Sequence, residues 1–317
     1  MYGAIALGST AANACDRYAE ERQHAQSGAY VQTDSMGAAP KNITTVRLKA
    51  PKQLIENSAA AMSVRQPGVL FSINDSGNDP LLFALDTTGA DRGVWRVLGA
   101  TNVDWESAAV APCAPAAPTV SCVFIGDTGD NNSRHPYRVI YRAREPVASG
   151  GRDTIRADAL RYVYEDGPHD VEAMYVAPTG DIVLITKRPL GGGGGRLRPA
   201  LVFSIPVSAW RSKALARAKL VDSLPIVPGS AALRLITDAS LSPDAKHVAV
   251  LTYAQLFVFS TAPTGLVDHR VSPSVCNIVP LGEQQGEGVT WADNRGRFAF
   301  TSEGHKVPLM LANCPLP

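Results

Sequence analysis

The chain has 317 residues, of which 45% are hydrophobic and 19% charged, so it is able to bury a substantial core. Its formal net charge is +1, from 30 basic and 29 acidic residues, which excludes a global electrostatic attraction to nucleic acids or anionic membranes. No apolar run reaches the roughly 18 residues of a membrane-spanning helix, so none is predicted.

Residues 1–41 are interpreted as a leader. Residues 4–14 (AIALGSTAANA) are small and apolar and end directly before Cys15, which resembles the end of a secretory signal. Residues 16–41 are polar and aperiodic, as in segments without a packed core. We therefore expect a secreted or periplasmic protein, with Cys15 as a candidate lipid attachment point. A disordered leader without export is the alternative.

The cysteines support the same interpretation. Cys113 and Cys122 bracket a Pro-rich loop between two predicted strands, where a hairpin disulfide would fit, and Cys276 and Cys314 form a candidate second pair. Five free thiols in a reducing compartment are the alternative, because unpaired cysteine also serves as a small apolar residue.

Residues 42–317 are predicted to form one domain of short strands, because apolar runs alternate with Gly, Pro, Asp and Asn turns. Five similar segments recur along it and are each followed by a turn and a second apolar run. The five first segments are 58–64 (SAAAMSV), 106–111 (ESAAVA), 172–177 (EAMYVA), 238–243 (DASLSP) and 287–292 (EGVTWA). The five second runs are 69–75, 122–127, 182–188, 247–253 and 297–303.

Third and fourth strands complete most repeats, but the last repeat lacks a fourth strand and residues 44–49 (TTVRLK) lack a partner. The sequence therefore predicts an all-β fold, a five-bladed β-propeller closed by pairing this N-terminal strand with the last blade. Closure removes the exposed edges of an open sheet. A six-bladed propeller and a β-sandwich are the alternatives. One helix is expected, at residues 208–220 (SAWRSKALARAKL).

An acidic residue recurs near the start of four of the five inner strands, at Glu106, Glu172, Asp238 and Glu287. Inner strands surround the axis of a propeller, so these carboxylates would converge, with Asp104 and Asp170 on the same strand faces two residues earlier. Crowded carboxylates favour a bound cation, and oxygen donors favour Ca²⁺. The predicted metal ligands are Asp75, Glu106, Asp127, Glu172, Asp238, Glu287 and Glu303. Loops 74–78 and 126–132 add oxygen donors, although such residues also cap hairpins.

Basic residues near the same end of the channel are candidates for holding an anionic substrate, namely Arg134, Lys187 and Arg188. Ion pairing of Lys187 and Arg188 with the acidic ring is the alternative. Three further residues are candidates for proton transfer. They are His169, His305 and Tyr253.

Five motifs carry a resemblance to a known family: 102–107 (NVDWES), 126–131 (GDTGDN), 169–173 (HDVEA), 237–244 (TDASLSPD) and 287–291 (EGVTW). Over about residues 55–304 the chain resembles secreted bacterial β-propellers of the esterase-like phytase type. The resemblance implies a calcium-binding propeller outside the cytoplasm that hydrolyses phosphate esters. The basic cluster of a phytase pocket is thin here, which argues against phytate itself. The chain is less closely similar to calcium-activated nucleotidases (apyrases), which are five-bladed propellers with a central calcium.

The sequence thus predicts a monomeric, extracytoplasmic hydrolase that uses Ca²⁺ on a phosphate ester or other small anionic substrate. Two alternatives from other classes stay open. One is a non-catalytic propeller that binds a protein or glycan partner at the cell surface. The other is a lyase or epimerase of uronic acids with His169 or Tyr253 as the base.

Overall fold

The structure is a computed structural model that describes residues 37–187, 199–212, 214–224, 226, 235–282, 285–304 and 307–317. In this part of the chain, β-strands predominate and the helical turns are short 3-10 segments, such as η2 (Val207–Arg211) and η4 (Val279–Leu281). The predicted leader lies outside the described residues up to position 36. Ala38, assigned to that leader, forms a parallel bridge with Cys276.

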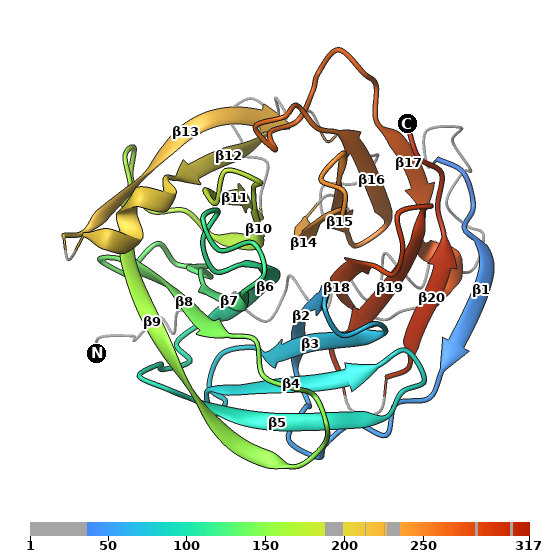
Figure 1. Ribbon diagram of the computed structural model, residues 1–317. Helices are drawn as coiled ribbons and strands as arrows, with labels where there is room; N and C mark the ends of the chain where they lie inside the picture. Colours follow the sequence, from blue (N-terminus) through green and yellow to red (C-terminus); the bar gives the residue numbers. More distant parts are fainter. Residues whose placement is uncertain are drawn as a thin grey trace, which may run out of the picture.

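The strands pair into five antiparallel units of four, arranged around a common axis (Figure 1). Unit 1 contains β2 (Asn57–Met62), β3 (Val69–Asn74), β4 (Leu81–Asp86) and β5 (Asp91–Leu98). Unit 2 contains β6 (Trp105–Pro112), β7 (Ser121–Asp127), β8 (Arg138–Arg144) and β9 (Arg152–Tyr164). Unit 3 contains β10 (Val171–Val176), β11 (Ile182–Thr186), β12 (Ala200–Ile205) and β13 (Ala216–Leu224). Unit 4 contains β14 (Ile236–Leu241), β15 (His247–Thr252), β16 (Gln255–Ser260) and β17 (Ser274–Asn277). Unit 5 contains β18 (Gly286–Trp291), β19 (Arg297–Ser302), β20 (Leu309–Asn313) and β1 (Lys41–Val46).

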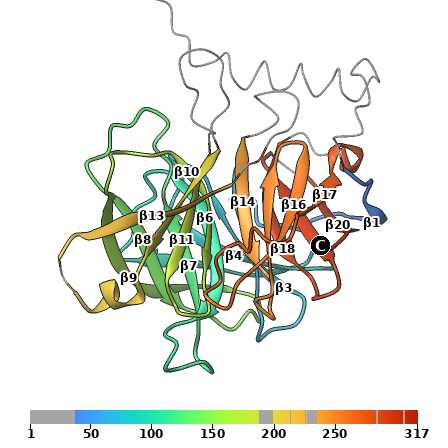
Figure 2. The same cartoon turned by 90° about the horizontal axis from the view of Figure 1, so that it is seen from above.

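The first strand of each unit lies at the centre, and these inner strands run along the axis (Figure 2). Each contacts the inner strands of the two neighbouring units, and β18 contacts β2. Large buried clusters lie between successive units, for example the one that joins Phe71 of unit 1 to Ile125 of unit 2. Second strands such as β3 and β7 are buried on both faces, which explains their apolar runs in the sequence. The structure confirms the all-β propeller fold.

The hydrogen-bonded sheets are not five separate blades. Strand β9 has 13 residues, and its first part pairs in parallel with β5 while its second part pairs with β8. Its end also pairs in parallel with β13, so units 1, 2 and 3 share one 12-stranded sheet. In the described part of the chain no sheet closes on itself, and the ring is formed by side-chain packing. The last unit takes its outer strand from β1, with Thr44 opposite Leu311.

The prediction of a helix at residues 208–220 is wrong. The chain makes the short 3-10 turn η2 and then enters β13, which pairs with β12. The run of Ala, Arg, Lys and Leu favours a helix locally, but the outer edge of β12 offers backbone hydrogen bonds that an isolated short helix could not match. Tertiary pairing overrides the local preference here.

Both predicted disulfides are confirmed. Cys113 bonds to Cys122 within unit 2, and Cys276 of β17 bonds to Cys314 just after β20. The second disulfide therefore ties unit 4 to unit 5. Two disulfides are typical of proteins from an oxidising compartment. Among the described residues, no helix has the length and apolar character of a transmembrane span.

Candidate functional site

Each inner strand carries a β-bulge at its start. In every unit, the pairing between the first and second strands skips one residue of the first strand. The skipped residues are Ser58, Glu106, Glu172, Thr237 and Glu287. Bulges redirect side chains and are frequent beside functional sites. Here they set three glutamates at equivalent positions around the axis, and only 6%, 2% and 6% of Glu106, Glu172 and Glu287 are exposed.

The pairing register corrects the predicted repeat in unit 4. Thr237 takes the bulge position, and Asp238 lies one residue further along the strand. The side chain of Asp238 is completely buried and accepts backbone N–H groups from Ala239 at 2.8 Å and from Val289 of β18 at 2.8 Å. A weaker bond from the Ala60 N–H of β2 measures 3.4 Å. Asp238 therefore links three inner strands, and the acid recurs at the bulge in three units, not four.

A second ring of side chains follows the second strands. In each unit, the residue before the bulge pairs with a residue near the end of the second strand, and the next residue along the chain belongs to this second ring. The ring consists of Asp75, Thr128, Lys187, Tyr253 and Glu303. Asp127 falls one position earlier, at the partner position itself. There its Oδ1 accepts the Asp104 N–H and pairs with Arg138 Nη2, both at 2.9 Å. The structure thus uses Asp127 to hold unit 2 together.

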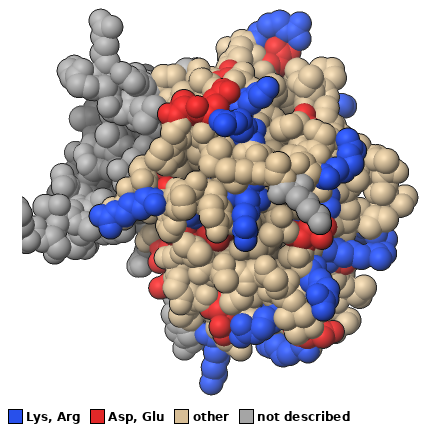
Figure 3. All heavy atoms as spheres, turned by 90° about the vertical axis from the view of Figure 1, so that its left-hand side faces the viewer, with Lys and Arg blue, Asp and Glu red and all other residues tan. Residues whose placement is uncertain are grey.

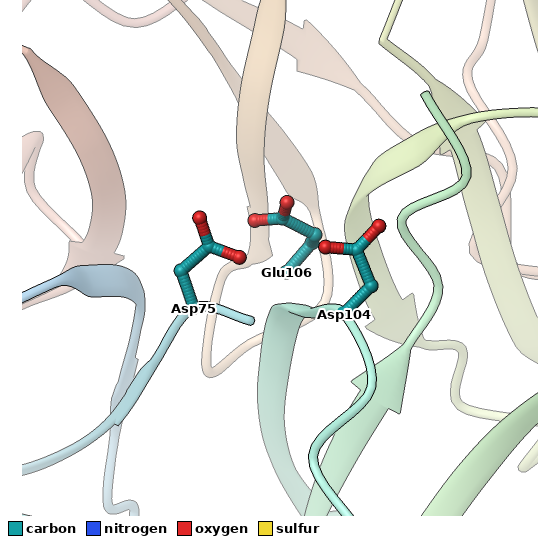
Figure 4. A group of neighbouring side chains, drawn as sticks. All are labelled: Asp75, Asp104 and Glu106. Atoms are coloured by element: carbon teal, nitrogen blue, oxygen red, sulfur yellow. The ribbon is translucent and has the colours of Figure 1, made fainter. Parts of the chain in front are cut away.

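The two rings meet in a cluster of three carboxylates, Asp75, Asp104 and Glu106. One carboxylate oxygen from each residue lies within 4.8 Å of the other two. Figure 4 shows the three side chains pointing toward one another from two neighbouring units. We refer to these residues as the acidic cluster. Among the described residues it is the grouping that could hold a metal ion, and its donors are all oxygen atoms, as a hard cation such as Ca²⁺ requires.

Two neighbours position the acidic cluster. The Asn102 side-chain amide donates to the carbonyl oxygens of Asn74 at 3.0 Å and Asp75 at 2.7 Å, and its oxygen accepts the Trp105 N–H. Asn102 thereby fixes the end of unit 1 against the start of unit 2. On the other side, a Cβ on Gly129 would lie 2.6 Å from Asp104 Oδ2 and 2.7 Å from Glu106 Cγ. The loop at 126–132 therefore packs its backbone against the carboxylates.

The crowding raises the proton affinity of these acids. Burial raises the pKa of Asp104 to about 6, and the carboxylate of Asp75 adds to the rise while Arg138 opposes it. Burial, with the carboxylates of Glu172 and Asp75, raises the pKa of Glu106 well above its ordinary value. Burial likewise raises the pKa of Glu303, helped by Asp75 and Glu56. A divalent cation would relieve this repulsion, so the residues present fit a bound metal.

Lys187 neutralises the deepest part of the ring. Its Nζ forms a short ion pair with Glu172 Oε1; the Glu172 side chain is buried and that of Lys187 is 14% exposed. Burial alone would lower the pKa of Lys187, but Glu172, Glu106, Asp170 and Glu287 together raise it well above its ordinary value. The ion pair that we considered as the alternative for Lys187 is therefore present. The ammonium group of Lys187 also interacts electrostatically with the carboxylates of Glu106, Asp170 and Glu287.

The environment of Glu287 differs from that of the acidic cluster and favours its protonated form. Tyr253 Oη donates to Glu287 Oε1 at 2.8 Å, and Gln285 Nε2 donates to the same oxygen at 3.0 Å. Burial raises the pKa of Glu287 to about 7, although Lys187 and these two donors lower it. A carboxyl group with this pKa can take up or release a proton near neutrality.

The remaining predicted site residues lie elsewhere. The His169 ring packs against Tyr164 and Phe203 and hydrogen-bonds Asp166 Oδ1 at 2.9 Å, so the structure does not bring it to the acidic cluster. Arg134 is exposed, and its backbone N–H donates to Asp130. Arg188 and His305 lie outside the described residues.

One residue of the acidic cluster was not among the predicted ligands. Asp104 lies two residues before Glu106, and this spacing predicted that it shares a strand face with Glu106. It was not counted as a ligand because it precedes β6 and an equivalent acid does not occur in all five repeats. A cavity of about 620 Å³ lies at the other end of the inner strands and is lined by residues such as Met62, Val176 and Leu241. None of the described residues that line it has a charged side chain.

Comparisons with solved structures support the fold. The chain is similar to the glutaminyl cyclase of Myxococcus xanthus, with 12% identity, a TM-score of 0.51, and coverage of 87% of this chain and 97% of that one. The likeness shows the fold alone. A luciferin-regenerating enzyme matches with 11% identity, a TM-score of 0.42 and coverage of 86% and 81%. The pyranose dehydrogenase PQQ domain from Coprinopsis cinerea matches with 9% identity, a TM-score of 0.41 and coverage of 89% and 98%. No protein-family model matches the chain, and no curated protein matches its sequence.

Proposed function

We propose that this chain is a metal-dependent hydrolase that acts on a phosphate ester or another small anionic substrate at the acidic end of its central channel. The observation that carries the proposal is the acidic cluster of Asp75, Asp104 and Glu106, whose carboxylate oxygens lie within 4.8 Å of one another. Their oxygen chemistry favours Ca²⁺ as the ion. A bound divalent cation would supply Lewis-acid polarisation of the substrate and charge to attract it.

We assign metal binding, proton transfer and substrate binding to different residues of the chain. Asp75, Asp104 and Glu106 would hold the ion, and Asn102 would keep the two contributing units in register. Glu287 would accept or donate a proton during hydrolysis, a role supported by its pKa of about 7 and the hydrogen bond from Tyr253. Lys187 would form its ion pair with Glu172 and also attract the anionic group of the substrate.

We further propose that the protein acts outside the cytoplasm. The Cys113–Cys122 and Cys276–Cys314 bonds support this location, because such bonds persist in oxidising compartments.

A second candidate function rests on Glu287 alone. A buried carboxyl group that titrates near neutrality serves as a general acid or base without a metal. A solved structure with a similar fold is the glutaminyl cyclase of Myxococcus xanthus, so cyclisation of an N-terminal glutamine is the reaction to test.

The decisive experiment measures Ca²⁺ binding and turnover together. Calorimetric titration of the EDTA-treated protein should give saturable Ca²⁺ binding, and the Asp104→Asn variant should bind about tenfold more weakly or worse, since it removes a charged ligand. Asp153→Asn, at an exposed position of β9, is the matched control and should bind like the wild type. Hydrolysis of p-nitrophenyl phosphate and nucleotides should require Ca²⁺ and Asp104.

The outcomes separate the candidates. Absence of Ca²⁺ binding would exclude the metal-dependent hydrolase. Ca²⁺ binding without turnover of any phosphate ester would favour the non-catalytic binding propeller. Cyclisation of an N-terminal glutaminyl peptide in EDTA, with loss of the activity in Glu287→Gln, would establish the second candidate instead.

A further inference from the structure

A second cavity of about 330 Å³ opens in unit 2, on the side of the acidic cluster but further from the axis. It is lined by the loop between β5 and β6, by the start of β8 and by the end of β9. Its polar lining includes Asp127, His135, Tyr137, Arg138, Tyr141 and Arg161. This set contains two arginines and one carboxylate, which is the reverse of the balance in the acidic cluster.

Arg138 forms the inner wall of this cavity and is incompletely paired. It is 4% exposed, and its Nη2 donates to Asp127 Oδ1 at 2.9 Å. Its Nε–H is buried and has no hydrogen-bond partner among the described residues. A buried guanidinium donor without an acceptor costs stability, so such a group calls for an acceptor from a ligand or from water.

Asp127 does not supply that acceptor, because its carboxylate bonds Arg138 through Nη2 and not through Nε. Its Oδ1 accepts the Asp104 N–H at 2.9 Å in addition to the bond from Arg138. The backbone of Val103 also bonds this carboxylate. The lining of the cavity thus has two guanidinium groups and one carboxylate, and that carboxylate is bonded to Arg138.

Arg161 supplies the second cation, at the outer wall. Its guanidinium lies over the Tyr137 ring, 5.2 Å from the centroid, and no carboxylate pairs with it among the described residues. A guanidinium stacked on an aromatic ring keeps its edge free to donate to an oxyanion. The hydroxyl of Tyr141 also lies at this cavity, where it accepts the Thr101 N–H at 3.3 Å and contacts Thr101 Oγ1 at 3.4 Å.

We propose that this cavity is a binding site for a small oxyanion, the carboxylate or phosphate group of a ligand, held between Arg138 and Arg161. The site adjoins the acidic cluster through the single hydrogen bond from the Asp104 N–H to Asp127. A ligand that spans both would place an anionic group here and its reacting group at the acidic cluster. The site itself requires no metal, so it stands or falls independently of the proposed hydrolase function.

The experiment titrates the EDTA-treated full chain with inorganic phosphate and, separately, with acetate at constant ionic strength, and measures binding by calorimetry. We expect saturable one-to-one binding of at least one anion, and the stronger of the two identifies the preferred group. Arg161→Gln should weaken binding about tenfold or more, because it removes a charge-assisted donor. Arg138→Lys keeps the buried charge opposite Asp127 but loses the planar donor set, and it should weaken binding similarly.

The matched control is Arg217→Gln, an exposed arginine of β13 on the neighbouring unit. Figure 3 shows Lys and Arg interspersed with Asp and Glu on the side of the molecule where β9 and β13 lie. Wild-type affinity in the Arg217→Gln variant, together with weaker binding in Arg161→Gln, supports the proposal. No saturable binding by the wild type, an equal loss in Arg217→Gln, or unchanged binding in Arg161→Gln would overturn it.

Discussion

Replacing Glu287 by glutamine should make the metal-free protein more stable at alkaline pH. The side chain is almost fully buried, and Tyr253 and Gln285 both donate to Oε1. The amide oxygen of glutamine accepts the same two bonds, so the substitution locks the neutral form with little change in shape. Because the pKa of Glu287 is raised by burial from 4.5 to about 7, the ionised form destabilises the fold.

The magnitude follows from linkage. A carboxyl group whose folded pKa is raised binds its proton more tightly in the folded than in the unfolded state. Its contribution to stability is therefore lost as the pH rises from about 4.5 to about 7. The gap of 2.5 between these pKa values corresponds to about 3 kcal/mol. Lys187 and the other acids titrate with Glu287, so the measured gain is expected at about 2–3 kcal/mol.

The assay is urea unfolding in EDTA at about pH 5 and about pH 8, where the two protonation states of Glu287 dominate. Glu287→Gln should match the wild type at the lower pH and exceed its free energy of unfolding at the higher pH. Glu165→Gln, at an exposed outer position, is the control and should follow the wild-type pH dependence. A Glu287→Gln variant that tracks the wild type at both pH values would refute the reasoning.

Three further predictions concern the acidic cluster and the disulfides. Gly129→Ala should weaken Ca²⁺ binding by about tenfold or more while the circular dichroism spectrum stays unchanged, because the new Cβ would contact Asp104 at 2.6 Å; wild-type affinity would contradict the packing argument. Ca²⁺ affinity should rise as the pH increases through about 6, since Asp104 must lose its proton to bind, and calorimetry at several pH values would detect a flat profile if this is wrong. Removing the Cys276–Cys314 bond, which closes 38 residues, should cost about 4 kcal/mol, whereas removing Cys113–Cys122, which closes 9, should cost about 3 kcal/mol. Denaturant unfolding of the two double alanine variants checks the order, and the reverse order would contradict the loop-entropy account.

Local patterns in the sequence were sufficient for the fold class and for the Cys113–Cys122 pair, whereas Cys276–Cys314 was only a candidate. Short apolar runs separated by turn residues, as at β3 and β7, require buried strands whatever their partners. Cys113 and Cys122 flank a single hairpin, so their proximity follows from the loop itself. The outer strands were less predictable, because β13 has a helix-favouring composition and becomes a strand only beside β12.

The convergence of acidic side chains was also visible in the sequence, but the identity of the converging residues was not. Glu106, Glu172 and Glu287 share the bulge position as expected, whereas Asp238 differs by one residue. A one-residue slip turns a strand side chain to the other face, and only the pairing register between strands determines it. An alignment of the repeats by their acidic residues put Asp238 at the bulge position, which Thr237 occupies in the structure.

The amino-acid sequence by itself determined that the chain forms an all-β propeller with carboxylates at one end of its inner strands, because strand periodicity and repeat spacing are local properties. The tertiary structure decided which carboxylates act together. Asp75 and Asp104 come from different units, and they meet because Asn102 joins the two loops and Gly129 leaves room for the side chains. Contacts between units depend on packing and register across the ring, and these distances are not encoded in any single segment of the chain.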